Sequence, residues 1–379
     1  MVRFSAVGDV AFGDHPLCVG FGVRSRLGAD RVASPFVGVM GQFRRADLLF
    51  GNLECTLSVT GLNAHDYRSV QMRGCPALLE QLKDAGFTVL NVANNHSLQH
   101  GEQPFRETCA MLESRGIRVC GVRAVQSSGS EPVYVETKGL RVAFLGYSLR
   151  PRQYFSREPL YAEGSLRSIA DEVARIRQSA DTVVVSLHWG EEFVRRPSPE
   201  EIHIAREIVD AGADLVLGHH PHIVRAIEEY HGSYIAYSLG NFVCDMTWDE
   251  RLRESIIFSC ELTDAGPRNL EIQPVHISED YRPEIMGEPD SALFLEELKS
   301  LALDLGFREE GAARGAIYDR AYEREARAAM KIVTLKSRLH FLRSIGRYPP
   351  RLLLQQVERF LRCRYDRLLG RERLPDLDG

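Results

Sequence analysis

The sequence lacks several features that would each point to a particular class of protein. Its eight cysteines are scattered and include no C-x-x-C pair, so neither a zinc ribbon nor a dithiol redox centre is expected. No uninterrupted apolar stretch reaches the roughly 18 residues that a membrane-spanning helix needs. The formal net charge is only −5 over 379 residues, which argues against a protein that coats nucleic acid. We therefore expect reduced, mostly buried thiols and no nucleic-acid partner.

The first residues also lack the pattern of a secretion signal. Met1 leads directly into Val-Arg-Phe-Ser-Ala-Val-Gly-Asp, without a basic segment, an apolar segment and a small-residue cleavage site in succession. We expect a cytoplasmic protein, either free or bound peripherally at the inner face of a membrane. Because 44% of its residues are hydrophobic, the chain can bury a large core, and we expect one large domain with an appendage.

Short apolar runs alternate with amphipathic segments over roughly the first 220 residues, a pattern that is typical of an α/β domain. The predicted strands are 4–7, 47–50, 89–92, 142–145, 182–187 and 215–217, and the predicted helices are 76–85, 103–114, 165–179 and 199–211. From Ile223 to Ile277 turns separate strand-like runs, which predicts a second, more antiparallel sheet. These runs are 235–239, 255–260 and 270–275.

Two prolines and a glycine between residues 283 and 289 indicate a boundary. We expect residues 1–285 to form the α/β domain and residues 286–379 to form a helical extension. Between Lys331 and Arg373, twelve basic residues occur with only three acidic ones, so this extension is strongly basic.

The last part of the extension has the pattern of a basic amphipathic helix. Its apolar residues recur at helical spacing among arginines, at Leu353, Val357, Phe360, Leu361, Leu368 and Leu369. Such a helix packs on its own domain, lies on an anionic membrane surface, or docks on a partner in a synthesis complex or on an anionic polymer. The sequence leaves these alternatives open.

Polar side chains follow the predicted strands at the points where the strands end. They are Asp9 after the first strand, Asn52 and Glu54 after the second, Asn94, Asn95 and His96 after the third, His188 after a later one, and His219, His220 and His222 after the last. The carboxyl ends of strands in an open α/β sheet form its ligand sites, so we expect these side chains at one sheet edge. Carboxylates, amides and imidazoles bind divalent cations, and the pattern predicts a metal site.

Each motif by itself has a plainer explanation. An aspartate after a strand often forms a turn or caps a helix, and Asn94 or Asn95 would suit the start of the next helix. A single histidine at a strand end is more often a core or loop residue than a ligand. Three histidines within four residues, together with carboxylates at earlier strand ends, favour the metal site.

The order of these motifs resembles that of the calcineurin-like metallophosphoesterases, which runs Asp-x-His, Gly-Asp-x-x-Asp, Gly-Asn-His, His and Gly-His-x-His. The sequence is more similar to the CapA family of bacterial capsule and poly-γ-glutamate biosynthesis proteins, through the motifs at 52–54, 94–96, 188–190, 218–222 and 237–242. The resemblance covers about residues 2 to 280. It implies the α/β metallophosphoesterase fold, a sandwich of mixed β-sheets flanked by helices, with a helical C-terminal extension.

The resemblance also implies roles for individual residues. The metal ligands would be Asp9, Glu54, Asn95, His188, His220 and His222, with His219 as the alternative to His220. His96 would be the general acid beside the leaving group. The residues that bind substrate would be Asn52, Asn94, His219 and Asn241, although Asn241 equally suits a plain turn.

The sequence departs from the two family patterns at two places. Ala11 stands where the phosphoesterases have a histidine, so one metal position lacks a ligand. Gln99 and His100 stand where many CapA-like proteins have an aspartate, which points to an altered substrate preference.

The implied function is that of a metal-dependent hydrolase with one or two Mn, Fe or Zn ions. Its substrate would be a phosphoester or an amide-linked polymer in the biosynthesis of a capsule, an exopolysaccharide or poly-γ-glutamate. The alternative is a non-catalytic accessory protein of a polymer synthesis or export complex with a vestigial site, which Ala11 favours slightly.

Overall fold

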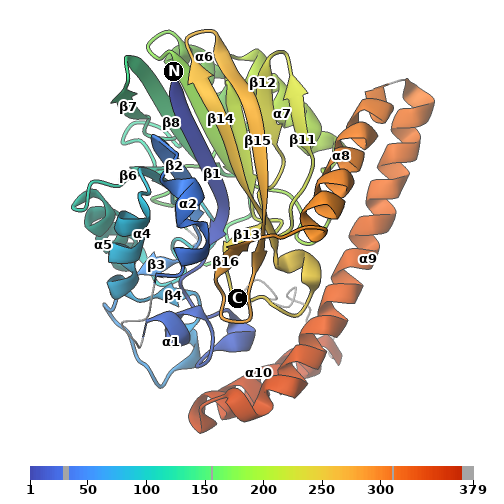
Figure 1. Ribbon diagram of the computed structural model, residues 1–379. Coiled ribbons are helices and arrows are strands. Elements are labelled where there is room, and N and C mark those ends of the chain that lie inside the picture. The colour runs from blue at the N-terminus through green and yellow to red at the C-terminus, as the bar shows by residue number, and fades with distance from the viewer. Residues whose placement is uncertain (29–33, 155–156, 310, 369–379) are drawn as a thin grey trace.

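The computed structural model describes residues 1–28, 34–154, 157–309 and 311–368. Two β-sheets pack face to face, and helices cover their outer faces (Figure 1). The first sheet has the strand order β16-β15-β14-β1-β2-β5-β6, and β13 also pairs with β1. These strands are β1 (Val2–Val10), β2 (Leu48–Leu53), β5 (Val89–Asn91), β6 (Arg118–Cys120), β13 (Asn241–Val243), β14 (Glu254–Thr263), β15 (Gly266–Ile277) and β16 (Pro283–Ile285).

The second sheet has the strand order β11-β12-β10-β9-β8-β7. Its strands are β7 (Val133–Thr137), β8 (Leu140–Ser148), β9 (Thr182–His188), β10 (Leu215–His219), β11 (Ile227–Tyr230) and β12 (Ser233–Ala236). Its four inner strands are parallel, and β7 and β11 run antiparallel along the edges. A short ribbon of β3 (Thr56–Leu57) and β4 (Arg73–Gly74) lies apart from both sheets.

Aromatic side chains join the two sheets at the centre of the sandwich. Phe4 of β1 and Phe50 of β2 both contact Phe144 of β8, with ring centroids 6.3 and 6.0 Å apart. Alternate residues of β1 point to opposite faces, as a strand requires. Phe4 therefore lies between the sheets and Val7 packs beneath the helices on the outer face, where an irregularity in the strand after Ala6 also places Val10.

Seven α-helices belong to the described part of the sandwich, and serine caps mark the start of two of them. They are α1 (Val23–Leu27), α2 (Met40–Phe43), α3 (Tyr67–Val70), α4 (Leu79–Ala85), α5 (Glu102–Glu113), α6 (Leu166–Arg177) and α7 (Pro199–Asp210), and the 3₁₀ turns are η1 (Pro16–Cys18), η2 (Val37–Val39), η3 (Pro76–Leu78), η4 (Glu250–Leu252) and η5 (Ile345–Arg347). Ser165 and Ser198 open α6 and α7 with capping boxes, in which serine and the residue three positions later exchange hydrogen bonds.

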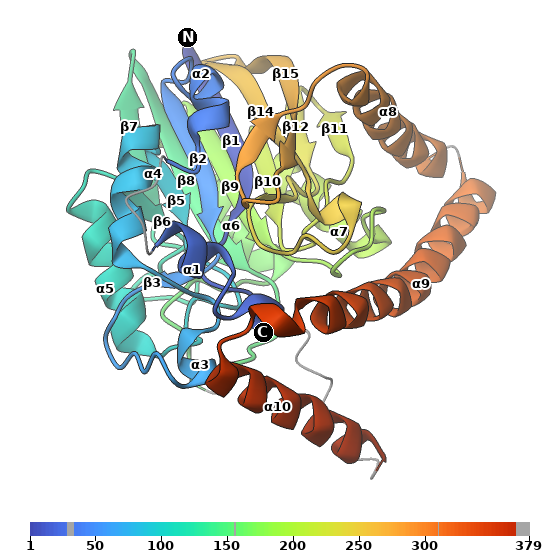
Figure 2. The same cartoon turned by 60° about the horizontal axis from the view of Figure 1, so that its bottom comes forward.

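Three helices follow the last strand and curve around one side of the sandwich (Figure 2). They are α8 (Asp290–Glu309), α9 (Ala312–Ser344) and α10 (Pro350–Leu368). Phe294 of α8, Val333 of α9 and Leu352 of α10 are buried in separate apolar clusters with residues of the sandwich. Within the described chain, no helix is long and apolar enough to cross a membrane.

The expected sandwich of mixed sheets with flanking helices and a helical C-terminal region is confirmed. The expected division into an N-terminal α/β sheet and a later antiparallel sheet is wrong. β14 and β15 extend the sheet of β1, while β11 and β12 extend the sheet of β8 to β10. Local periodicity identifies a strand, but pairing over some 250 residues of separation depends on burial between distant segments.

Part of the basic C-terminal helix packs on the protein's own domain, which was one of the alternatives that the sequence left open. Leu353 packs beside Phe341 and Tyr348, and Arg359 donates a hydrogen bond of 2.7 Å to the Tyr67 hydroxyl. Val357 is exposed. The side chains of the other predicted apolar positions, Phe360, Leu361, Leu368 and Leu369, lie outside the described residues.

Candidate metal centre

The predicted site residues gather at the carboxyl ends of strands from both sheets. Asp9 of β1 lies beside Asn52 of β2, and His188 of β9 lies beside His219 of β10. The expectation of a single sheet edge is therefore wrong. Because the two sheets pack face to face, the ends of β1, β2 and β5 meet the ends of β9 and β10 in one buried cluster.

Two glycines allow the loop at residues 237–240 to close over these strand ends. A Cβ atom on Gly8 would lie 1.9 Å from the Gly240 carbonyl oxygen, and one on Gly218 would lie 2.1 Å from the Tyr237 oxygen. No side chain fits at either position, since backbone atoms cannot move aside. Glycine at these two strand ends brings Asn241 down to the level of the histidines.

One group of donor atoms converges around His188. Its Nε2 atom lies 2.8 Å from Asn95 Oδ1 and 3.5 Å from Glu54 Oε1. The His220 ring is adjacent, with its centroid 4.8 Å from that of His188. Glu54, His188 and His220 each offer a ligand atom, and these atoms lie within 4.8 Å of one another.

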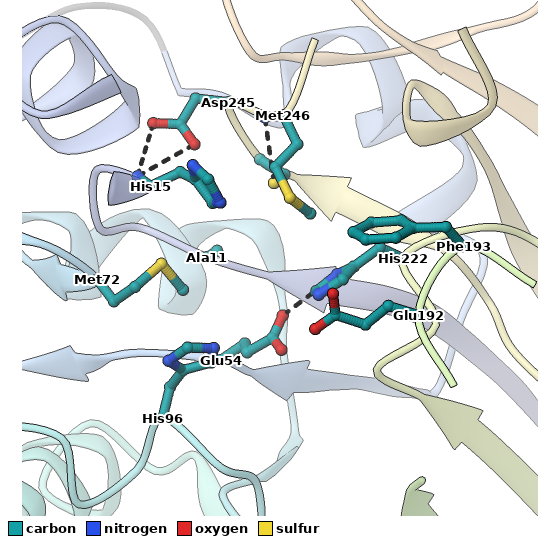
Figure 3. A pocket seen from close by; sticks show the side chains of 11 residues that line it. Ala11, His15, Glu54, Met72, His96, Glu192, Phe193, His222, Asp245 and Met246 are labelled. Carbon is teal, nitrogen blue, oxygen red and sulfur yellow. Dashed lines mark hydrogen bonds and ion pairs between the residues drawn. The ribbon is translucent and has the colours of Figure 1, made fainter. Parts of the chain in front are cut away.

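A second group shares Glu54. His222 Nδ1 lies 3.6 Å from Asp9 Oδ2 and 3.8 Å from Glu54 Oε2, and the three residues again form a cluster of potential ligands. Ala11 lines the same pocket and supplies no ligand atom, as its sequence position implied (Figure 3). A carboxylate between two groups of donors is the arrangement that a bridging ligand of two cations adopts.

The polar atoms and the backbone at His220 fit a metal ligand. Its side chain is fully buried, and neither ring nitrogen has a hydrogen-bond partner within the described chain. Leaving such atoms unsatisfied costs about 1–3 kcal/mol. The backbone is left-handed at His220 (φ 93°) and at His222 (φ 60°), each at a further cost of about 1–3 kcal/mol. A bound cation would offset both costs.

The charges in the cluster match the same interpretation. Burial holds the pKa of His188 and of His220 well below the ordinary value, so both rings are neutral and keep a lone pair for a cation. Burial alone would raise the pKa of Asp9, but its interactions with the neighbouring histidines, His219 foremost and then His222 and His188, outweigh burial and lower that pKa to about 2. The residues thus combine anionic oxygens with neutral nitrogens, the donor set of Zn, Mn and Fe sites.

Of the three asparagines predicted to bind substrate, two contact a proposed ligand directly and the third fixes a nearby turn. The Asn52 amide donates to Asp9 Oδ1 at 2.8 Å, and Asn241 Oδ1 lies 2.9 Å from His222 Nδ1. Asn94 donates to the Leu53 carbonyl and accepts from the His96 backbone, which fixes the turn after β5. Each of these asparagines is fully buried, and their contact with substrate stays a prediction.

His219 lies on the far side of Asp9 from the ligand groups. Its Nδ1 atom is 3.3 Å from Asp9 Oδ1, and its ring packs against Phe50. The ligand groups found among the described residues contain His220 and not His219. This geometry favours His220 as the ligand and gives His219 the role of supporting the Asp9 carboxylate.

His96 is oriented by its neighbours at the edge of the cluster. Its Nδ1 atom lies 2.8 Å from Gln99 Oε1, and its Nε2 atom lies 3.3 Å from the Asn95 amide nitrogen. His96 lines the same pocket as Glu54 and His222. Gln99, which departs from the related sequences, therefore has a visible function in holding the imidazole ring.

The pocket also contains residues that the sequence did not single out. Glu192 lies next to His220 and His222 on the ligand wall, and His15 and Asp245 lie on the opposite wall (Figure 3). Asp245 accepts hydrogen bonds from the backbone of His15 and of Val23. None of the three follows a predicted strand directly. Only Glu192 could have been found from the sequence, because it is a carboxylate four residues after the predicted ligand His188.

Comparison with known proteins places this geometry in a family. The family model for the bacterial capsule synthesis protein PGA_cap matches residues 3–246. The capsule biosynthesis protein CapA of Bacillus anthracis is 30% identical, covering 73% of this chain and 68% of that protein. The PGA biosynthesis protein CapA of Bacillus subtilis is 31% identical, covering 73% of this chain and 71% of that protein.

Among solved structures, a novel phosphatase from Mycoplasma pneumoniae superposes with a TM-score of 0.47 at 11% identity, covering 77% of this chain and 96% of that one. That likeness is too distant to inform the function. The match to the family model spans most of the α/β region and includes every predicted ligand. The chain belongs to the CapA family of bacterial capsule synthesis proteins, which the PGA_cap model describes.

Proposed function

We propose that this protein is a metal-dependent hydrolase, similar in chemistry to phosphoesterases, that acts in the biosynthesis or processing of a bacterial capsule, exopolysaccharide or poly-γ-glutamate-type polymer. The observation that supports it most strongly is the convergence of Glu54, His188 and His220 with Asp9 and His222 in one buried cluster that borders a pocket. Buried polar groups are costly, and this set has the composition of a metal centre.

The chain would hold cations at two neighbouring positions. Glu54, Asn95, His188 and His220 would form one of them, and Asp9, Glu54 and His222 would form the other. Divalent ions bound there would lower the pKa of water and stabilise negative charge on the oxygen under attack. The ions would be Mn, Fe or Zn, because imidazole and carboxylate ligands suit all three.

His96 would supply the proton that the leaving group needs. Gln99 Oε1 accepts from Nδ1, which fixes the ring plane and directs Nε2 toward the cluster. In the imidazolium form the ring would also carry a proton at Nε2, and this proton would pass to the departing oxygen or nitrogen as the bond breaks, leaving the neutral ring with its proton on Nδ1. Asn95 lies between His96 and His188 and would keep the acid beside the ligands without making it one.

The polymer context of the proposal comes from the relatives. Those of Bacillus anthracis and Bacillus subtilis are named for capsule and PGA biosynthesis. The substrate would be a phosphoester in a glycan or nucleotide-sugar pathway, or an amide bond of the polymer itself.

A non-catalytic accessory role is the second candidate, and Ala11 is the observation that favours it. One ligand group contains only Asp9, Glu54 and His222, and Ala11 adds nothing to it. Two Mycobacterium tuberculosis relatives, 31% identical over 52% of this chain, are named probable polyglutamine synthesis accessory proteins. In this alternative the cluster would be a remnant that stabilises the fold.

Metal analysis and hydrolysis assays of the same preparations separate the two candidates. Mn²⁺-loaded protein would be tested on an aryl phosphomonoester, an aryl phosphodiester and a γ-glutamyl anilide. We expect hydrolysis of at least one, and Glu54→Ala should lower bound metal and abolish that activity. If the native protein binds Mn²⁺ fully but hydrolyses none of the three test substrates, and therefore does not differ in activity from Glu54→Ala, the result would favour the accessory role.

A further inference from the structure

Glu192 occupies a position in the metal centre that neither the motifs nor the relatives' names assign. It lies in the loop between β9 and α7 and is 7% exposed. Its Oε1 atom is 3.8 Å from His220 Nε2. Ligand atoms of Glu192, His220 and His222 lie within 4.8 Å of one another, and Figure 3 shows the carboxylate beside His222 and Glu54.

The loop that carries Glu192 is anchored on both sides of it. Arg225 donates to the Glu191 carbonyl at 2.7 Å and to the Val194 carbonyl at 2.6 Å. Phe193 has a left-handed backbone (φ 64°), and its N–H donates to the Pro221 carbonyl between the two histidines. This strained, doubly anchored loop sets the carboxylate against the His220–His222 segment, as a preorganised ligand requires.

Two observations indicate that the carboxylate serves a cation. The fully buried His220 ring, whose nitrogens have no hydrogen-bond partner within the described chain, belongs to the same group as Glu192. Ala11 leaves the neighbouring group of Asp9, Glu54 and His222 one ligand short of four. We propose that Glu192 is a carboxylate ligand of the metal centre and compensates for the histidine that Ala11 replaces. This inference rests on the metal centre of the proposed function.

Direct metal binding tests it without reference to activity. Apo protein would be titrated with Mn²⁺ by calorimetry and followed by electron paramagnetic resonance, and metal content would be measured by mass spectrometry. Glu192→Gln should lower Mn²⁺ affinity at one position by at least about tenfold, or remove that ion. The matched control is Glu191→Gln, whose side chain is 59% exposed and should bind Mn²⁺ as the native protein does.

The outcomes distinguish this inference from the proposed function. Native stoichiometry and affinity in Glu192→Gln, with unchanged thermal unfolding, would overturn the ligand assignment and leave the hydrolase proposal standing. Loss of Mn²⁺ in Glu192→Gln but no hydrolysis by the native protein would support the ligand and count against the hydrolase. A native protein that binds no Mn²⁺ would overturn both.

A second inference rests on α9, which is apolar on two opposite faces. One face packs on the sandwich through Ala329, Val333 and Phe341. On the other, Ile332, Leu335, Leu339 and Leu342 are 43–61% exposed. At 100° per residue these four positions fall within an arc of about 80°. We name these four residues the outer stripe, and Figure 1 shows α9 along the flank of the molecule.

Basic side chains border the outer stripe, and the surrounding sequence contains no acidic residue. Between Ala326 and Val357 the sequence contains seven basic residues and no Asp or Glu. Lys331 and Arg338 lie along one side of the stripe and Arg343 along the other, and all three are exposed. A second copy of this face would bring like charges together, whereas anionic lipid headgroups would complement them.

We infer that the outer stripe of α9 docks on an anionic membrane surface, with leucines among the acyl chains and arginines at the phosphates. Full-length protein would be co-sedimented with phosphatidylcholine vesicles that contain or lack phosphatidylglycerol. Pelleting should require phosphatidylglycerol and weaken as salt is added, because salt screens the lipid charge. Leu335→Ser/Leu342→Ser should weaken binding at least about tenfold.

Two leucines of α8 provide a matched control. Leu293 and Leu303 are 63% and 75% exposed, and Leu293→Ser/Leu303→Ser should pellet as the native protein does. Equal pelleting of native protein and the α9 variant, or no preference for phosphatidylglycerol, would overturn the inference. It would also be overturned if the native protein formed dimers that the α9 variant does not, since a second copy would then cover the stripe.

Discussion

Replacement of Arg225 by methionine should destabilise the fold and loosen the metal centre together. Arg225 is fully buried, and its guanidinium donates to Glu201 Oε1 at 2.5 Å as well as to the two loop carbonyls beside Glu192. Glu201 in turn accepts from the Ser198 N–H at the start of α7. One side chain thus joins the segment between β10 and β11, helix α7 and the loop after β9.

The size of the effect follows from what the substitution leaves behind. Methionine fills a similar volume but leaves the Glu201 carboxylate buried without its cation, which costs about 3–5 kcal/mol. The two loop carbonyls also lose their donor, and each buried acceptor left unsatisfied adds about 1–3 kcal/mol unless the loop moves to reach water. We expect a loss of roughly 3–5 kcal/mol in the free energy of unfolding, with part of the cost relieved by loop movement.

Urea unfolding followed by circular dichroism would measure this loss, and Mn²⁺ titration would report on the loop. Arg327 pairs with Glu323 on the surface of α9, where the side chains are 73% and 60% exposed, so Arg327→Met should change stability by less than about 0.5 kcal/mol. A loss below about 1 kcal/mol in Arg225→Met would refute the reasoning. Unchanged Mn²⁺ affinity would show that Arg225 does not position Glu192.

Two further predictions concern the pocket. His96→Asn should retain bound metal while hydrolysis falls by roughly 10²- to 10⁴-fold, and a loss of metal with activity would make His96 a ligand or a structural residue. Burial, and then the charge of Asp14, raise the pKa of Asp245 from 3.8 to about 8, so the folded state holds a proton that the unfolded state has released. The free energy of unfolding should therefore fall as pH rises from about 4 to about 8, and a pH series of urea unfolding should be flatter for Asp245→Asn. An equally steep series in that variant would contradict the assignment to Asp245.

The sequence by itself determined most of the secondary structure, and it singled out most of the side chains that the structure gathers in the buried cluster. Strands at residues 4–7, 182–187 and 215–217 lie within β1, β9 and β10, because a buried strand needs a continuous apolar run. Asp9, Glu54 and His222 could be selected because each lies within five residues after such a run, and a side chain just past a strand end has few positions open to it. These side chains come together because the carboxyl ends of their strands meet in the folded protein.

The tertiary structure decided which strands meet and which residues from outside the motifs lie beside the clustered side chains. β14 pairs with β1, and Glu192 lies 3.8 Å from His220 on a loop whose backbone accepts hydrogen bonds from Arg225. The exposure of the outer stripe likewise depends on α9 packing through its opposite face. A repeat of apolar residues along a helix or strand shows that the element has an apolar face. Which segment packs on that face depends on burial between segments far apart in the chain.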